Sequence, residues 1–153
     1  NYFIHLYVNF AYHFESTHIC KKGNQTYMIA ESLFIQRTKK KGWGVFTDKP
    51  LEEGTIIEVA PVIVMSAAER VLLDKTRLFN YIFEWEHDQC CMALGYVPLY
   101  NHASPSNCEY FQVYEDGTIF VKTVSKINAG DELTINYNGD SNNDAKVWFD
   151  LHE

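Results

Sequence analysis

"YNHASPSNC" occupies residues 100–108 and cannot form a regular helix. Pro105 has no main-chain N–H and fixes its own φ, while Ser and Asn favour turns. Aromatic and apolar residues flank the stretch, so we expect a loop held inside the protein, with Asn101 and His102 in an apolar neighbourhood. Taken alone this pair is ambiguous, because buried Asn and His side chains often only satisfy main-chain groups.

The composition of the chain is that of one compact domain. It has 153 residues, of which 46% are hydrophobic and 22% charged, which argues against disorder. The net charge of −7 disfavours direct contact with nucleic acid, which usually needs a basic face, and suits a basic partner such as a lysine-rich peptide. No apolar run is as long as a membrane span, so no membrane association is expected.

The cysteines indicate reduced thiols. Cys20, Cys90, Cys91 and Cys108 form neither a CxxC pair nor the spacing of a small disulfide scaffold. We therefore expect an intracellular protein, without distinguishing the cytoplasm from the nucleus.

The N-terminal residues are treated apart from the domain. Residues 1–31 begin with an aromatic-rich stretch that makes a poor signal peptide, since it lacks a basic start and an obvious cleavage site. They are either an amphipathic element packed on the domain or an extension outside the fold. The domain itself is expected to span residues 32–153, with a short aromatic C-terminal tail.

The remaining pattern predicts a mostly-β domain with one helix. The helix should follow Ser66, because Ser66 and Glu69 have the spacing of a capping box. Residues 55–65 are β-branched but contain Pro61, which predicts two short strands in place of one. Further strands are expected at residues 32–38 and 43–47 and at both ends of residues 80–102. A hairpin is expected around Asp116-Gly117, and a last strand after the Ala129-Gly130 turn.

Two other segments matter beside residues 100–108. "GWGVFT" at 42–47 contains a G-x-G turn, which lets the main chain approach a ligand closely. "GDELTINY" at 130–137 is a turn that leads into a strand. Each is a weak signal alone, since an isolated G-x-G is usually only the entry to a strand.

In this order and combination, the three segments resemble the signature of the SET-domain protein lysine methyltransferases. The matching residues are Gly42-Trp43-Gly44, Asn101-His102-Ala103 with Ser106-Asn107-Cys108, and Gly130-Asp131-Glu132-Leu133 ending at Tyr137. The resemblance covers residues 32 to about 150. It implies a SET-domain, β-clip-like fold of several small sheets with one short helix and a knot-like C-terminal segment.

The resemblance also implies the cofactor, S-adenosylmethionine, and the residues that bind it. In this family the Asn-His loop holds the amino-acid and adenine portions of the cofactor, and the G-x-G strand completes the pocket through its main chain. The ring of Trp43 is expected to pack near the cofactor. The residues assigned to cofactor binding are Gly42, Trp43, Gly44, Tyr100, Asn101, His102 and Trp148.

Tyr137 matches the catalytic tyrosine of the family, and its alternative is a core tyrosine at a strand end. Methyl transfer to an amine is an in-line displacement, so catalysis consists chiefly of alignment. A free lysine has a pKa of about 10.4 and must lose its proton first, which an apolar, aromatic channel favours. Tyr81, Tyr96 and Tyr100 are candidates for the channel wall, with ordinary packing as the alternative.

The chain departs from the family pattern at several positions. Ala103 replaces a serine, and Ile135 stands where many members have a Phe or Tyr that limits the number of methyl groups, so multiplicity stays open. Cys108 matches a zinc ligand of members with a cysteine-rich segment after the tyrosine, but no cysteine follows it here. His87, Cys90 and Cys91 are better explained as turn and buried residues, so no metal is predicted.

Trp148 and Phe149 follow the polar run "GDSNND" in the C-terminal tail. We expect them to fold back as an aromatic lid over the cofactor and lysine pocket. The alternatives are a hydrophobic anchor for the tail and an oligomer contact.

The resulting expectation is an S-adenosylmethionine-dependent lysine N-methyltransferase. Its partner would be a lysine-containing, basic protein or peptide, on family habit a histone-like tail. The alternatives are a non-catalytic SET module that binds a peptide or protein, and a methyltransferase acting on small molecules or on residues other than lysine. The substrate protein and the oligomeric state stay open.

Overall fold

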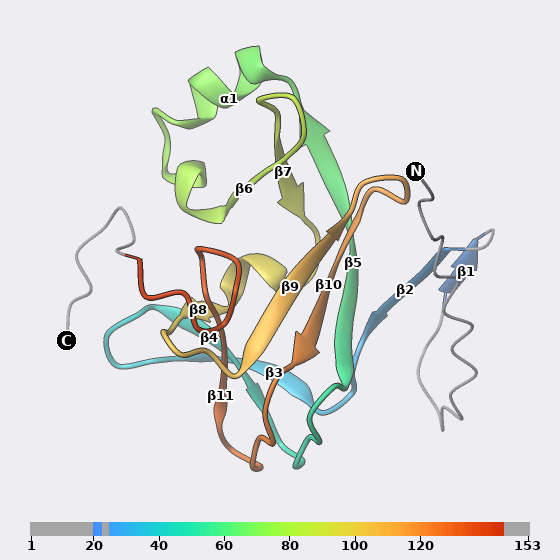
Figure 1. The fold of residues 1–153 in the computed structure, drawn as a ribbon, viewed down its shortest axis with the longest axis vertical. Helices are drawn as coiled ribbons and strands as arrows, with labels where there is room; N and C mark the ends of the chain where they lie inside the picture. The colour runs from blue at the N-terminus through green and yellow to red at the C-terminus, as the bar shows by residue number, and fades with distance from the viewer. Residues whose placement is uncertain (1–19, 23–24, 146–153) are drawn as a thin grey trace, which may run out of the picture.

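The structure is a computed structural model that describes residues 20–22 and 25–145 (Figure 1). Strands dominate, as the sequence predicts, and three short helices lie between them in this part of the chain. The elements, in chain order, are β1 (Cys20–Lys22), β2 (Gln25–Ile29), β3 (Leu33–Arg37), β4 (Trp43–Thr47), β5 (Ile56–Met65), α1 (Ala67–Leu73), the 3₁₀ helix η1 (Arg77–Tyr81), β6 (Phe83–Glu84), β7 (Cys90–Ala93), the 3₁₀ helix η2 (Val97–Leu99), β8 (Asn101–His102), β9 (Cys108–Val113), β10 (Thr118–Thr123) and β11 (Glu132–Ile135).

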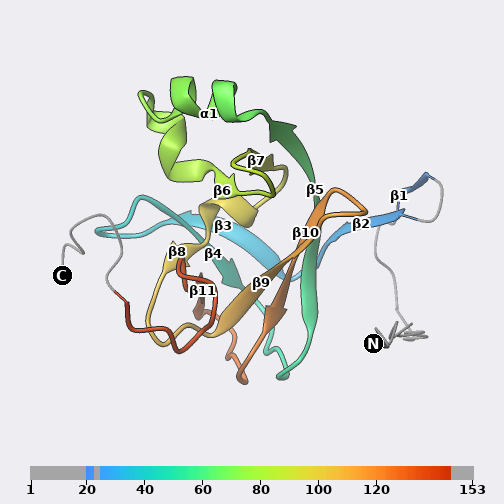
Figure 2. The same cartoon turned by 45° about the horizontal axis from the view of Figure 1, so that its top comes forward.

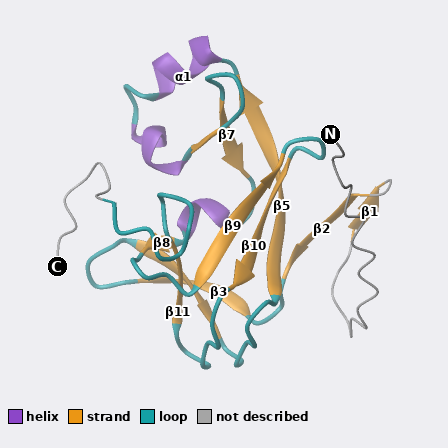
Figure 3. Ribbon diagram, viewed as in Figure 1, coloured by secondary structure: helices purple, strands orange, loops and turns teal. Residues whose placement is uncertain are grey.

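The strands form several small, connected sheets (Figure 3). The main path of hydrogen-bonded neighbours runs β1-β2-β5-β10-β9-β11-β4-β3. Away from this path, β7 joins β5 to β6, and β8 pairs with β11. The predicted mostly-β fold class is confirmed.

The β5 strand corrects one prediction, because Pro61 does not divide it. Strand β5 runs unbroken for 10 residues and changes partner at the proline. The half before Pro61 pairs with β10, and the half after it, from Val62 to Met65, pairs with β7. Proline cannot donate to a ladder, but here it lies at the junction between two ladders and the Pro61 carbonyl still accepts from the Leu94 N–H.

The predicted helix is present and its capping box is complete. Ser66 accepts from the Glu69 N–H, and the Glu69 carboxylate accepts from the Ser66 N–H at 2.8 Å. Helix α1 and helix η1, with β6 and β7, form a lobe at one end of the molecule (Figure 2). This lobe stands beside the long β9–β10 hairpin and supplies one side of the pocket described below.

The predicted turns are confirmed by their main-chain angles. Gly117 joins β9 to β10 with φ 59°, and Gly130 precedes β11 with φ 89°. His87 and Asp88 form the turn before β7 with φ of 55° and 61°.

The C-terminal segment crosses the loop at residues 103–107. Strand β11 runs parallel to β8 and β9 and antiparallel to β4. Beyond it, the Ser106 N–H donates to the Ser141 carbonyl, and the Ser104 hydroxyl and Asn136 side chain both donate to the Asn143 carbonyl. This crossing agrees with the knot-like segment of the expected fold.

The hydrophobic core includes residues of the loop and of the strands next to this crossing. Its fully buried members include Tyr100, Cys108, Leu133 and Ile135, which come from the loop and strands that carry the sequence motifs. Strand β2, which precedes the expected boundary at residue 32, pairs with β5. The boundary itself stays a prediction, and residues 1–19 lie outside the described residues.

Candidate active site

Tyr137 lies two residues after the end of β11, with its side chain half-buried against the core. Its hydroxyl donates to the main-chain carbonyl of Tyr100 at 2.9 Å. Burial raises the pKa of Tyr137 to about 12, and the charges of Tyr81 and Glu132 add to the rise. The phenol is therefore neutral at physiological pH, and the direction of its proton is set by the loop.

His102 connects Tyr137 to the loop. Its Nδ1 accepts from the Tyr137 N–H at 3.2 Å, and the two rings lie 5.3 Å apart. An accepting Nδ1 requires a neutral imidazole with its proton on Nε2. Burial lowers the pKa of His102, and the charge of Lys41 lowers it further, which keeps the ring neutral.

Asn101 is the second predicted residue that the fold holds in a defined orientation. Its side-chain amide donates to the Trp43 carbonyl at 3.1 Å and to Glu132 Oε1 at 2.6 Å. One amide thus joins the loop to β4 and to β11, two strands that also pair with one another. Its side chain is almost fully buried.

Asn107 explains why the second half of the loop motif is needed. Its side-chain amide N–H donates to the Glu132 main-chain carbonyl at 2.8 Å, and its side-chain oxygen accepts from the Thr134 N–H at 2.8 Å. This pair of bonds fixes β11 against the loop and thereby sets where Glu132 and Tyr137 lie.

The two glycines of the G-x-G segment do different things. Gly42 has φ 78°, a left-handed conformation that glycine adopts without strain, in open space. A Cβ on Gly44 would lie 2.5 Å from Glu132 Oε1 and 2.9 Å from Asn101 Nδ2. Gly44 therefore leaves room for the main chain to approach this polar pair.

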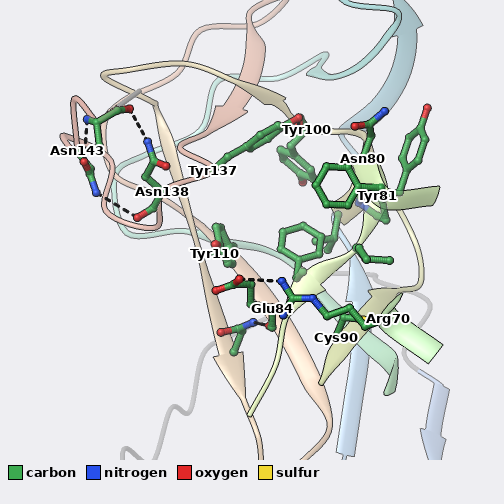
Figure 4. A pocket seen from close by; sticks show the side chains of 17 residues that line it. Arg70, Asn80, Tyr81, Glu84, Cys90, Tyr100, Tyr110, Tyr137, Asn138 and Asn143 are labelled. Carbon is green, nitrogen blue, oxygen red and sulfur yellow. Dashed lines mark hydrogen bonds and ion pairs between the residues drawn. The ribbon is translucent and has the colours of Figure 1, made fainter. Parts of the chain in front are cut away.

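A pocket of about 560 Å³ opens beside Tyr137 (Figure 4). It lies between the lobe formed by α1, η1, β6 and β7 and the strand β9, and the segment after Tyr137 closes one side. Six of its 17 lining residues are aromatic, and Arg70, Glu84 and Gln112 form a polar end. The aromatic lining residues are Phe79, Tyr81, Phe83, Tyr100, Tyr110 and Tyr137.

The predicted site residues fall into two groups that meet at His102 and Tyr137. Gly44, Asn101 and the Trp43 carbonyl form one polar cluster, whereas Tyr81, Tyr100 and Tyr137 line the pocket. Of the candidate wall residues, Tyr96 does not line the pocket, and its N–H donates to the buried Glu58 carboxylate.

The Trp43 and Tyr100 side chains lie apart from the polar cluster. The Trp43 ring is 46% exposed and lies against the Arg37 guanidinium, 4.9 Å from the ring centroid. The Tyr100 ring is buried in the core, and its carbonyl is the group that contacts Tyr137. Their assignment to cofactor binding stays a prediction.

Other expectations concern the tail and metals. Trp148 and Phe149 lie outside the described residues, so the aromatic lid stays a prediction. Among the described residues, no group of three or more His, Cys, Asp and Glu side chains could hold a metal ion. Within the same part of the chain, Cys90, Cys91 and Cys108 are buried free thiols. The absence of a metal from the protein stays a prediction.

The model of one protein family, the SET domain, matches residues 42–138. This match covers more than half of the chain and contains all three sequence motifs. The chain belongs to the SET-domain family. The resemblance first read from the motifs is thereby confirmed.

One curated relative indicates the activity of this SET domain. This chain is 30% identical over 124 residues to a Schizosaccharomyces pombe protein named histone-lysine N-methyltransferase, H3 lysine-37 specific. The alignment covers 80% of both chains. This SET domain is a protein-lysine methyltransferase.

Solved structures share the fold. A Plasmodium falciparum protein described as a candidate histone methyltransferase superposes with a TM-score of 0.57 at 25% identity, covering 71% of this chain and 95% of its own. A chain of Polycomb Repressive Complex 2 from Chaetomium thermophilum superposes with a TM-score of 0.60 at 22% identity, covering 71% of this chain and 16% of its own. The second likeness supports the fold alone.

Two residues of this SET domain had no role assigned from the sequence. Glu132 accepts from Asn101, and the Lys41 ammonium donates to the His102 carbonyl at 3.0 Å. Each lies inside or next to a motif, so a charged residue beside the predicted cofactor-binding segments was the available signal. None of the described helices is long and apolar enough to cross a membrane.

Proposed function

We propose that this SET domain transfers a methyl group from S-adenosylmethionine to the ε-amine of a lysine in a basic, histone-like protein segment. The observation that carries the proposal is the fixed Tyr137 hydroxyl, which lies where the aromatic pocket meets the Asn101–His102 loop. When bound, S-adenosylmethionine supplies an electrophilic methyl group for in-line displacement.

The residues around Gly44 fit the amino-acid part of this cofactor. A zwitterion needs a carboxylate near its ammonium group and a cation near its carboxylate. Glu132 and Lys41 carry those two charges, and both contact the Asn101–His102 loop. The missing Cβ of Gly44 leaves the space beside β4 in which the Glu132 carboxylate and the Asn101 amide lie.

The aromatic pocket suits the lysine. Tyr81, Phe83 and Tyr110 offer apolar ring surface, and a lysine placed among such rings loses hydration. Desolvation lowers the pKa of an amine, so the neutral, nucleophilic form is favoured as the side chain enters.

Tyr137 acts as a positioning and stabilising group. Its proton points at the Tyr100 carbonyl, so its oxygen would act as the acceptor for the amine N–H and for weak C–H···O contacts with the transferring methyl group. Because the pKa of Tyr137 is raised to about 12, its hydroxyl does not serve as a base at neutral pH. The lysine proton is therefore released to water before transfer.

The net charge of −7 favours association with a basic tail, and a histone-like substrate implies a nuclear or other intracellular location. Ile135, at the position that limits the number of methyl groups in many members of the family, is fully buried in the core and does not line the pocket.

The test combines calorimetry with a methylation assay on the full chain. Wild type should bind S-adenosylmethionine at micromolar concentration and methylate lysine peptides from histone tails. Asn101→Ala should lose cofactor binding, whereas Tyr137→Phe should bind the cofactor and lose turnover. Well-folded wild-type protein that binds no cofactor, or that methylates small amines in preference to every peptide, would overturn the proposal.

A further inference from the structure

The polar end of the pocket contains an ion pair between Arg70 and Glu84. Arg70 on α1 and Glu84 on β6 lie 3.0 Å apart, and Figure 4 shows them at a different end of the pocket from Tyr137, with Tyr110 between. The Glu84 side chain is 85% exposed and that of Arg70 is 29% exposed. A ligand in the pocket therefore meets the carboxylate more readily than the guanidinium.

The two partners differ in what they would lose on separation. Asp74 lies one helical turn beyond Arg70, at the C-cap of α1. The hydrogen bond to Glu84 is the largest effect that raises the pKa of Arg70, and the charge of Asp74 adds to it. Arg70 thus keeps an acidic neighbour when Glu84 turns away. Glu84 needs only a rotation of its side chain, because the Gln112 amide holds its main-chain carbonyl.

The energetic cost of the exchange is small. An exposed ion pair contributes little to stability, so a second cation competes easily for the carboxylate. The pocket of about 560 Å³ has room for more than the one side chain whose amine must reach Tyr137. A cation at the Glu84 end would belong to a residue close in sequence to the target lysine.

We propose that Glu84 selects substrates with a second basic side chain near the target lysine, by exchanging Arg70 for that side chain. The inference rests on the proposed function, since it takes the pocket as the lysine-binding site. It assigns opposite roles to the ion-pair partners. Glu84 attracts the flanking cation, and Arg70 competes with that cation for the carboxylate.

The experiment uses peptides with one lysine and with arginine, alanine or glutamate at each of the three positions on either side. Binding is measured by fluorescence anisotropy and turnover by transfer of a labelled methyl group. At one or more positions, wild type should prefer arginine over alanine about threefold to tenfold in Kd and in kcat/KM. The preference should weaken as salt is added, because the pair is exposed.

Two variants should move this preference in opposite directions. Glu84→Gln should abolish the arginine preference, and Arg70→Gln should strengthen it because the competing cation is gone. A loss of folding or of pocket shape would instead lower the arginine preference in both variants. Glu86→Gln, an exposed carboxylate that does not line the pocket, is the matched control and should leave the preference unchanged.

Each outcome is decisive. No arginine preference in wild type, a preference that survives Glu84→Gln, or one that Arg70→Gln reduces would overturn the inference. If no peptide is methylated but the Kd values follow the expected order, the proposed function fails while the role of Glu84 stands.

Discussion

The Tyr137 hydroxyl donates a 2.9 Å hydrogen bond to the main-chain carbonyl of Tyr100, whose own ring is buried in the core. The orientation of the phenol is therefore set by a loop that the core immobilises. Burial also raises the pKa of Tyr137 to about 12, so the group meets a substrate as a neutral, oriented phenol.

Tyr137→Phe should reduce kcat about 100-fold or more, because the oxygen that orients the amine and methyl group is removed. The free energy of unfolding should fall by about 1 kcal/mol, since the Tyr100 carbonyl loses its partner. Steady-state methylation and urea denaturation measure the two effects. Tyr114→Phe, which removes an exposed hydroxyl bonded to Gln112, is the control and should keep full activity.

The same pKa predicts the pH dependence of turnover. Ionisation of Tyr137 should not contribute to the pH profile of kcat below about pH 11. A limb of the kcat profile between pH 8 and about 10 that disappears in Tyr137→Phe would contradict this.

The Asn101–Glu132 contact predicts a pair of compensating substitutions. Asn101→Asp puts a carboxylate oxygen where the amide now donates to Glu132 Oε1 at 2.6 Å, so two anions would face each other. Cofactor binding should weaken about 100-fold or more, because a buried contact between like charges is costly. Calorimetric titration with S-adenosylmethionine measures the loss.

Adding Glu132→Gln to Asn101→Asp should recover part of the affinity, because the Gln amide can donate to the new carboxylate. A double-mutant cycle gives the coupling between the two positions. Losses that simply add would contradict a direct contact.

Gly44→Ala and Gly42→Ala should have separable effects. A Cβ on Gly44 would lie within 3 Å of Glu132 and Asn101, so Gly44→Ala should weaken cofactor binding. Gly42 has open space around it but a φ of 78°, so Gly42→Ala should lower the free energy of unfolding by about 1 kcal/mol. Calorimetry and denaturation of both variants test the contrast, which fails if Gly44→Ala binds the cofactor as wild type does.

Glu58 predicts how stability depends on pH. Its side chain is fully buried, and burial raises the pKa of the carboxyl group from 4.5 to about 7, against the opposing hydrogen bonds from the Tyr96 and Val97 N–H groups. The folded protein therefore holds this proton more tightly than the unfolded chain. The stabilisation is complete below about pH 4.5 and is lost as the pH rises through about 7, a change of about 3 kcal/mol.

Glu58→Gln should remove this part of the slope. Denaturant unfolding of wild type and variant at several pH values between 4.5 and 8 gives the difference between their curves. Glu53→Gln, at an exposed position, should follow wild type. Parallel curves for wild type and Glu58→Gln would contradict the raised pKa.

Trp148→Ala tests the proposed aromatic lid. Loss of an indole that covers the cofactor should raise its Kd about tenfold, because apolar area stays in water. His152→Ala, in the same tail, is the control. Cofactor affinity and turnover that both match wild type would rule the lid out.

Local sequence determined much of this protein. The capping box at Ser66 and Glu69 and the turns at Gly117 and Gly130 follow from short-range chemistry, because each depends on residues within three or four positions. The three ordered motifs then indicated the family, and with it the mostly-β fold and the candidate catalytic Tyr137.

Tertiary structure alone decided the rest. Pro61 stays within one strand because β10 and β7 meet there, and a change of partner between distant strands leaves no local signal. The acid at Glu58 is buried for a similar reason, since its donors lie 38 and 39 residues away in the chain.

The charged groups of the site show the same division. Asn101 was recognisable from its motif, but its contact with Glu132 spans 31 residues and exists because β11 lies beside β8. The Arg70–Glu84 pair likewise joins α1 to β6 across 14 residues of the chain. The sequence motifs identify the candidate functional residues. The packing of strands and helices that are distant in the chain decides which charged groups face one another.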